Sequence, residues 1–206
     1  RGLAAFPARR SSDLLGGSEK GRRTLVTPEV FDRVKVENHD CEAKDLVYLG
    51  TTAHDTPVWI NHTVAAADFV VCLGACTHHI MAGFGGGRKS ILPGVSGLQT
   101  IRHNHAYSLD PDTLRSNPKI GNGVLEGNPL HEDMCEAAAM LPHLFMVNLV
   151  MNAQMQLCAF IARYTMNRCG SEEHTSELKS LTIPVCRLLL EKKNYQNFHT
   201  SLLVKA

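Results

Sequence analysis

Short apolar runs alternate with amphipathic segments between about residues 24 and 163 of the chain. Two of these runs, Phe69–Leu73 and Leu144–Val150, are almost continuously apolar, which is typical of strands buried on both faces of a parallel sheet. Shorter runs predict further strands at 34–36 and 46–49, and the apolar run 58–60 precedes a brief helix. The two long runs should therefore be the buried strands of one sheet.

The segments between these runs carry helix signals. Thr27 and Pro28 are typical of a helix N-cap and a first helical position, and a brief helix is expected near 61–67. In a helix predicted at about 131–141, the apolar residues that recur at helical spacing are Met134, Ala137, Ala138 and Leu141. Strands that alternate with helices predict an α/β fold with a Rossmann-like parallel sheet, flanking helices and right-handed crossovers.

Both ends of the chain lack the helical or strand periodicity of apolar residues. Three segments resemble translations of the adapters used in sequencing libraries: 9–14, 171–178 and 186–193. We therefore expect residues 1–23 and 169–206 to be artefactual flanks outside any domain, and residues 24–168 to be a fragment of one incomplete α/β domain. The alternative for the C-terminal end is a natural tail with a weak helix at 185–193.

The composition allows a globular core and argues against several partners. Of 206 residues, 44% are hydrophobic and 20% are charged, which fits one domain, or one domain and a fragment. A formal net charge of +1 gives no electrostatic footprint for nucleic acid or an anionic membrane. The seven cysteines include no C-x-x-C pair, which is typical of reduced thiols. Because the sequence also shows no membrane-spanning run and no signal peptide, we expect a cytoplasmic location.

A glycine-rich stretch at 78–94 is the most unusual part of the sequence. It runs from a histidine pair, through a glycine cluster at 83–87, to Arg88, Lys89 and a Pro-Gly turn. Glycine lets a backbone approach a ligand closely or adopt a positive φ. Because the stretch follows the strand Phe69–Leu73, it should lie at the sheet edge where α/β proteins usually bind ligands.

The same stretch resembles a phosphate-binding P-loop, but the motif fails. Arg88 stands where G-x-x-x-x-G-K-[ST] requires glycine, and Pro93 would interrupt the helix that must follow. Binding of an anion by the glycine backbone, with Arg88 beside it, stays open.

Two side chains in the stretch are candidates for chemistry. His79 directly follows a predicted strand, where it can serve as a general acid or base near neutral pH, while His78 should point away from it. Lys89 lies beside glycines and Arg88, a position that suits a nucleophile or a tether. The alternative for Lys89 is a solvated surface charge, the usual state of lysine.

A second histidine pair, His103 and His105, follows one short helix later. Ser96 and Gln99 have the spacing of a capping box, which predicts that this helix begins with Ser96 as N-cap. His105 shares a helix face with the apolar Ile101 and should point inward. As a ligand, its neutral imidazole would suit nickel, copper or zinc equally. The alternative is a core histidine hydrogen-bonded to a carbonyl.

One pattern connects these residues with segments further along the chain. It reads His79-x-x-Ala82-Gly83-Phe84-x-Gly86-Gly87-Arg88-Lys89-x-x-Leu92-Pro93-Gly94 and then Thr100-Ile101-x-x-Asn104-His105. It continues through Gly127-Asn128-Pro129, Glu132-Asp133-Met134, Ala137-Ala138 and Phe145-x-Val147-Asn148. Over about residues 24–163, this pattern resembles the nickel-pincer lactate racemase family.

The resemblance implies a cofactor and a role for each matched residue. It implies that Lys89 tethers a nickel-pincer nucleotide, a pyridinium mononucleotide of the 3,5-bisthiocarboxylic acid type. His105 matches the nickel ligand that the protein supplies, and His79 matches one of two catalytic histidines. The matched positions expected to line the cofactor are Gly86, Gly87 and Arg88. The resemblance assigns no role to His39, His78 or His103.

The reaction that the resemblance implies is racemisation of a 2-hydroxy acid. A histidine removes the hydroxyl proton while hydride passes from the chiral carbon to the cofactor, and the planar keto acid takes hydride back on either face. Lactate is the default substrate, although relatives act on other hydroxy acids or sugars. The sequence lacks the family's upstream His-Arg motif, its Thr-Arg-Pro segment and its second domain. We therefore expect a fragment of the cofactor-bearing N-terminal domain that is inactive alone.

Two other interpretations stay open at this point. A non-catalytic nucleotide- or metal-binding module would keep the glycine loop but would need neither Lys89 nor His79. An α/β domain with a purely structural histidine cluster would not bring His79, Lys89 and His105 together.

Overall fold

The structure is a computed structural model that describes residues 3–6, 18–151 and 157–166. The adapter-like segments at 9–14, 171–178 and 186–193, and the alternative helix at 185–193, lie outside the described residues. The strands are β1 (Leu3–Phe6), β2 (Lys35–Asn38), β3 (Val47–Thr51), β4 (Pro57–Ile60), β5 (Val70–Cys76), β6 (His78–His79), β7 (Gly83–Phe84), β8 (His143–Met151) and β9 (Leu157–Met166). The helices are α1 (Glu19–Val26), α2 (Pro28–Arg33), α3 (His62–Ala65), the short 3₁₀ helix η1 (Gly87–Ser90), α4 (Leu98–Ala106) and α5 (Pro129–Ala139).

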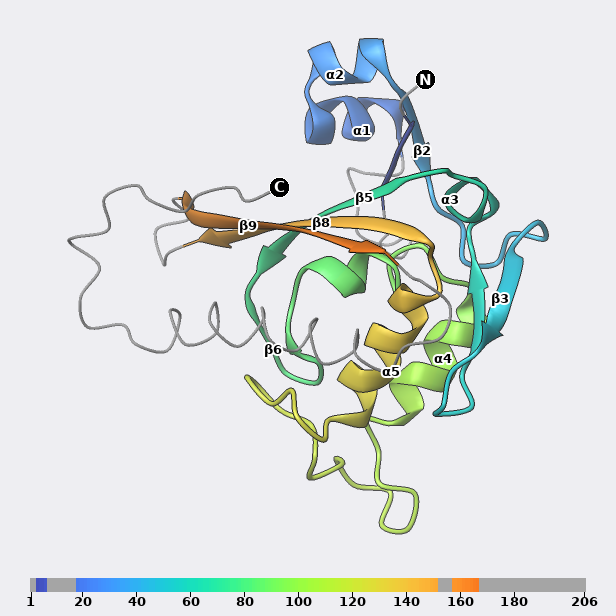
Figure 1. Ribbon diagram of the computed structural model, residues 1–206, viewed down its shortest axis with the longest axis vertical. Helices are drawn as coiled ribbons and strands as arrows, with labels where there is room; N and C mark the ends of the chain where they lie inside the picture. Colours follow the sequence, from blue (N-terminus) through green and yellow to red (C-terminus); the bar gives the residue numbers. More distant parts are fainter. Residues whose placement is uncertain (1–2, 7–17, 152–156, 167–206) are drawn as a thin grey trace.

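The main sheet has three strands in the order β5-β8-β9 (Figure 1). The two long apolar runs form its parallel pair, with Val70 opposite Leu144 and Cys76 opposite Val150. Strand β9 joins β8 in the antiparallel direction. The α/β class is therefore confirmed, while the wider Rossmann-like parallel sheet stays a prediction.

The shorter predicted strands exist but do not join β5 and β8. In the described part of the chain, β2 pairs with β1, and β3 pairs with β4 in the antiparallel direction. Antiparallel neighbours can be connected by a short turn, and only five residues separate β3 from β4. The expectation that these runs belong to one parallel sheet was therefore wrong for β3.

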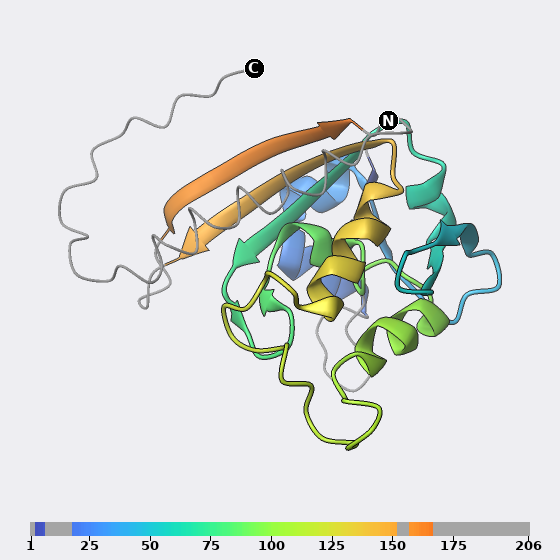
Figure 2. The same ribbon diagram turned by 60° about the horizontal axis from the view of Figure 1, so that its bottom comes forward.

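The inner face of the main sheet carries the core and is covered by α5 and η1, and α4 packs against α5 (Figures 1 and 2). The predicted stripe of α5 and the turn after it is confirmed, since the residues that are 0–2% exposed include Met134, Ala137, Ala138 and Leu141. Leu144 and Met146 of β8 belong to the same buried cluster. The helical stripe and the long apolar run therefore pack against each other, as expected of an amphipathic helix on a sheet.

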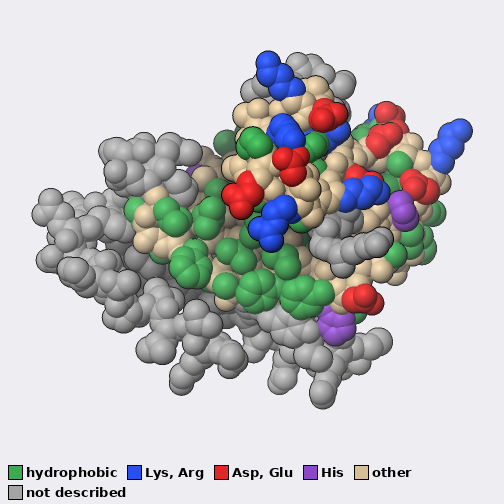
Figure 3. All heavy atoms as spheres, turned by 90° about the horizontal axis from the view of Figure 1, so that it is seen from above, with side chains coloured by type: hydrophobic (Ala, Val, Ile, Leu, Met, Phe, Trp, Pro, Cys, Tyr) green, Lys and Arg blue, Asp and Glu red, His purple; other side chains and the backbone are tan. Residues whose placement is uncertain are grey.

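The outer face of the main sheet is apolar and exposed. Val71 and Leu73 of β5 are 53% and 69% exposed, and Phe160 of β9 is 53% exposed. Figure 3 shows hydrophobic side chains gathered on this side of the molecule. The prediction that the run Phe69–Leu73 is buried on both faces was therefore wrong, because its alternate residues Val71 and Leu73 point away from the core.

The helices at the N-terminal end follow their local signals. Helix α1 begins at Glu19, inside the segment expected to be a flank, and the Ser18 side chain accepts a hydrogen bond from the Gly21 amide. Helix α2 begins as predicted, with Thr27 as N-cap and Pro28 in the first turn. Within the described residues, no helix has the length and apolar character needed to cross a membrane.

The start of α4 differs from the prediction. Gly97, not Ser96, is the N-cap. The Ser96 hydroxyl is fully buried and donates to the carbonyl of Ile91 at 2.8 Å. The capping-box prediction was therefore wrong, because a hydrogen bond to a carbonyl five residues earlier takes the hydroxyl that the box would use.

Candidate active site

The glycine cluster lies close against the inner face of the main sheet. A Cβ added to Gly74 of β5 would lie 2.8 Å from the Cα of Gly86, and one added to Gly87 would lie 2.9 Å from the Met146 sulfur of β8. Gly86 and Gly87 also have φ values of 85° and 39°, a region that favours glycine. In this structure, the glycines that we expected to line a cofactor allow the loop to approach the sheet.

Asn148 of β8 fixes this loop at a defined position. Its side-chain oxygen accepts a hydrogen bond of 2.7 Å from the Gly87 amide, directly before Arg88 and Lys89. The sequence did not identify this function. The available signal was a single polar residue inside the apolar run Leu144–Val150.

Arg88 holds the hairpin formed by β6 and β7. Its side chain is 6% exposed, and its guanidinium donates to the carbonyls of Ala82 and Phe84 at 2.8 and 3.2 Å. The Arg88 guanidinium therefore places a positive charge beside the loop, and its hydrogen bonds to Ala82 and Phe84 are made to the backbone. This geometry makes Arg88 a structural part of the site.

The hydrogen bonds of His79 determine where its ring proton lies. Nδ1 accepts from the amides of Met81 and Ala82 at 3.2 and 3.0 Å, so a neutral ring carries its proton on Nε2. Burial lowers the pKa of His79, and the nearby positive charges of Lys89 and Arg88 lower it further. His79 is therefore held in the neutral form that presents Nε2–H.

The Lys89 amine meets this imidazole. Its Nζ lies 3.2 Å from Nε2 of His79, and the backbone amide of Lys89 donates to the carbonyl of Gly86. Burial lowers the pKa of Lys89 to about 8, helped by the adjacent Arg88 charge. A larger fraction of this amine than of an ordinary lysine is therefore unprotonated near neutral pH, which is the form needed for a nucleophile.

His105 has the opposite tautomer from His79. Its Nδ1 donates to the carbonyl of Ile101 at 2.9 Å, which leaves the lone pair of Nε2 available. Burial lowers the pKa of His105, and the charge of Lys89 contributes in the same direction. The half-buried His105 therefore offers a neutral nitrogen ligand beside the lysine.

A buried polar network holds α4 and its histidine in place. The Asp133 carboxylate of α5 accepts from Asn104 at 2.7 Å and from Thr56 at 3.0 Å, and it also accepts from Thr52. All four side chains are 5% exposed or less. Since Asn104 directly precedes His105, this network fixes the helix turn that carries the imidazole. Its sequence signal is a carboxylate on the apolar stripe of α5.

The structure brings the predicted chemical residues together. His79 contacts Lys89, and the charge of His105 contributes to the lowered pKa of His79. The three histidines to which the resemblance assigns no role lie elsewhere: His39 is buried against the Ser96 carbonyl, His78 packs on the Phe84 ring, and His103 is exposed on α4.

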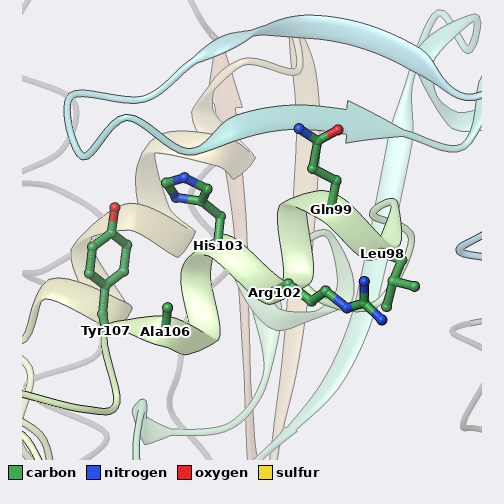
Figure 4. Close-up of a pocket in the computed structure, with 6 residues that line it drawn as sticks. All are labelled: Leu98, Gln99, Arg102, His103, Ala106 and Tyr107. Carbon is green, nitrogen blue, oxygen red and sulfur yellow. The ribbon is translucent and has the colours of Figure 1, made fainter. Parts of the chain in front are cut away.

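A separate hollow lies along α4. It has a volume of about 570 Å³ and is lined by Leu98, Gln99, Arg102, His103, Ala106 and Tyr107. Figure 4 shows that these side chains all come from α4 and the residue after it. His79, Lys89 and His105 do not line this hollow, so it is distinct from the candidate site.

Known proteins resemble this chain over much of its length. The lactate racemase N-terminal domain family matches residues 17–116. A lactate racemase from Thermoanaerobacterium thermosaccharolyticum is 36% identical over 147 residues, which cover 68% of this chain. The chain belongs to the lactate racemase family. A lactate racemase from Lactiplantibacillus plantarum is 35% identical over 103 residues, which cover 50% of the chain.

Solved structures show how much of a lactate racemase the chain represents. The lactate racemase apoprotein from Thermoanaerobacterium thermosaccharolyticum superposes with a TM-score of 0.66 at 28% identity, covering 84% of this chain and 37% of that one. A Thermotoga maritima protein of 18% identity has a TM-score of 0.56 over 76% of this chain and 39% of its own, and shows the fold alone. The chain spans 33% and 23% of the two lactate racemase sequences that it matches.

The donor set of the site fits the group that the family resemblance implies. Among the described residues, no group of three or more His, Cys, Asp or Glu side chains is arranged to hold a metal ion. A pincer nucleotide brings two sulfur donors and one carbon donor, so it requires one further ligand from the protein. The Nε2 lone pair of His105 could supply such a ligand, and the Lys89 amine could serve as a point of attachment.

Proposed function

We propose that this chain is the cofactor-bearing part of a 2-hydroxy-acid racemase, with lactate as the default substrate. The observation that carries the proposal is the 3.2 Å contact between the Lys89 amine and His79, with His105 close enough to affect the pKa of His79. An amine, an acid–base imidazole and a metal-ligating imidazole are the three functions that a tethered nickel-pincer nucleotide requires from a protein.

Lys89 and His105 are the residues that would hold the group. Lys89 would tether it covalently, and His105 would supply Nε2 to nickel because its Nδ1 is committed to the Ile101 carbonyl. When bound, the nucleotide supplies a reversible hydride acceptor. Gly86, Gly87 and Arg88 would support it mainly by fixing the Lys89 loop against β5 and β8.

His79 would move the hydroxyl proton of the substrate. With its proton on Nε2, the ring donates a hydrogen bond at that position. To accept a proton, Nε2 must present its lone pair, so the ring proton must move to Nδ1 and the amides of Met81 and Ala82 must be released. Base catalysis by His79 is thus coupled to the hairpin that carries these two amides.

The charges around the site favour an anionic substrate. Arg88 and Lys89 are adjacent, and within the described part of the chain no carboxylate forms an ion pair with Lys89. A 2-hydroxy acid carries one negative charge near neutral pH and is attracted by this field. The specific hydroxy acid or sugar would be selected by residues beyond those described.

Two properties of the parent protein complete the proposal. The site supplies one of the two catalytic histidines that the family resemblance implies, so we expect the 206-residue chain alone not to racemise. We also propose a cytoplasmic location, supported by the free thiols of Cys41, Cys72 and Cys76.

Intact mass and nickel content test the proposal directly. The full chain is produced together with the enzymes that make the nickel-pincer nucleotide. We expect a mass increment on Lys89 and about one nickel per chain. Lys89→Arg should lose both, whereas His105→Ala should keep the mass increment and lose the nickel. The exposed Lys119→Arg is the matched control and should behave as wild type. Loading of a full-length relative but not of this chain would contradict the proposal.

A further inference from the structure

The hydrogen bonds around His79 also determine the state of the lysine beside it. Because Nδ1 already accepts from two backbone amides, the ring proton lies on Nε2 and is directed at Nζ of Lys89, 3.2 Å away. An ammonium group has no lone pair and cannot accept this bond. The contact therefore favours the neutral amine of Lys89.

We propose that, before any cofactor is attached, the Lys89 amine forms an imine with a 2-keto acid. This activity goes beyond the proposed racemase function and does not depend on nickel. A half-buried primary amine with an imidazole N–H in contact is the arrangement that carbonyl-reactive lysines require. Keto acids are also the oxidised counterparts of the proposed substrates.

The step needs no oxidant or metal. The nitrogen lone pair first gives up its hydrogen bond with the Nε2–H of His79 and then attacks the keto carbon. A C–N bond forms as the C=O π bond breaks, and the oxygen takes up a proton while the nitrogen loses one, giving a carbinolamine. The C–O bond then breaks, water leaves, and the remaining N–H proton is released as the C=N bond forms. The Nε2–H of His79 is placed to hydrogen-bond the oxygen during addition and during its departure as water.

The surroundings favour keto acids over neutral ketones. The guanidinium of Arg88 lies next to Lys89 in the chain and contributes positive charge, while no carboxylate in the described residues is paired with the amine. The field therefore attracts the carboxylate of a keto acid. The lowered pKa of Lys89, about 8, increases the reactive fraction of amine relative to an ordinary lysine.

Reductive trapping tests the proposal on the full 206-residue chain without nickel or cofactor. The chain is incubated with pyruvate and sodium cyanoborohydride near pH 7.5, and the products are measured by intact mass and by peptide mapping. We expect the first carboxyethyl adduct on Lys89, about tenfold faster than on the exposed Lys44 and Lys119. Equal labelling of the three lysines would overturn the proposal.

Variants separate the parts of the proposal. Lys119→Met should retain the fast adduct and Lys89→Met should lose it, with circular dichroism confirming that both fold. His79→Phe removes the N–H and should slow labelling of Lys89 about tenfold or more. Undiminished labelling in that variant would overturn the role of His79. Acetone at the same concentration should label Lys89 more slowly than pyruvate, and equal rates would overturn the preference for keto acids.

The two proposals fail independently. An imine on Lys89 in a chain that never takes up the nickel nucleotide would contradict the racemase assignment and leave this inference standing. The converse result is a chain that loads the nucleotide while its Lys89 reacts with pyruvate no faster than Lys119 does. That result would overturn this inference and leave the racemase assignment standing.

Discussion

The two faces of the main sheet are built from the same strands and are specified in different ways. On the inner face, Gly74 and Met146 meet the loop residues Gly86 and Gly87 at distances that leave no room for an added carbon atom. On the outer face, Val71 and Leu73 are more than half exposed. Apolar character is common to both faces, but close steric fit and the chemical site belong to the inner one alone. Substitutions on neighbouring residues of one strand should therefore have very different effects.

The largest difference is expected between Gly74→Val and Ala75→Val. A side chain at Gly74 would overlap the backbone of Gly86, which cannot move aside as a flexible side chain could. We expect a loss of about 3 kcal/mol or more in the free energy of unfolding, measured by urea denaturation. Ala75 is exposed on the same strand, and its substitution should change stability by less than about 0.5 kcal/mol. Similar losses in both variants would refute the distinction between the faces.

Removing side-chain volume gives the next contrast. Met146 is 5% exposed and lies under the glycine loop, so Met146→Ala should cost about 2–5 kcal/mol through a cavity. Leu73 is 69% exposed, so Leu73→Ala should cost less than about 1 kcal/mol by the same measurement. A cost at Leu73 as large as that at Met146 would mean that the outer face is covered in solution.

A smaller effect should come from the hydrogen bond between Asn148 and Gly87. Asn148→Ala leaves the Gly87 amide without its acceptor and should cost about 1–2 kcal/mol. Asn148→Asp keeps an oxygen at this position and should recover part of that loss. If Asp is no better than Ala in urea denaturation, the bond does not hold the loop.

A contrast of a different kind is a pH dependence that arises on the inner side. The pKa of Lys89 is lowered from 10.5 to about 8 in the folded chain. Between these two values the unfolded chain binds a proton that the folded chain has lost, so stability should rise with pH across this window. Below pH 8 both states are protonated and the full penalty of burying the charge applies. Lys89→Met has no amine to titrate. The free energy of unfolding of wild type, relative to that of Lys89→Met, should therefore be higher at pH 10 than at pH 7.5. The same difference at both pH values would contradict the lowered pKa.

The sequence predicts the inner side better than the outer side, for physical reasons. The stripe of α5 has a helical period, and the parallel pair β5–β8 comes from two long apolar runs. A continuous apolar run has no period, however, so it does not reveal that Val71 and Leu73 are exposed. Glycine clusters indicate close approach without indicating what is approached. Here it is the sheet.

The site itself was predictable where it is local in the chain. His79 and Lys89 are brought together by one hairpin and one short helical turn, and the family pattern included both. The network around Asp133 was not predictable, because its hydrogen bonds join residues 77 and 81 positions apart. The cap of α4 was also not predictable, because the Ser96 hydroxyl could bond forward to the helix or back to the carbonyl of Ile91, and the spacing of the capping box does not distinguish the two.

The contact between the loop and β8 has a consequence for motion. Because the Gly87 amide is bonded to a β8 side chain and no Cβ separates the loop from the strands, opening of the loop must break this hydrogen bond together with the close packing against β5 and β8. The Gly87 amide should then exchange its hydrogen with solvent as slowly as the central amides of β8, although it lies outside any strand. A tether anchored at Lys89 would inherit the rigidity of the sheet, so its amine would keep its position up to the temperature at which the sheet melts.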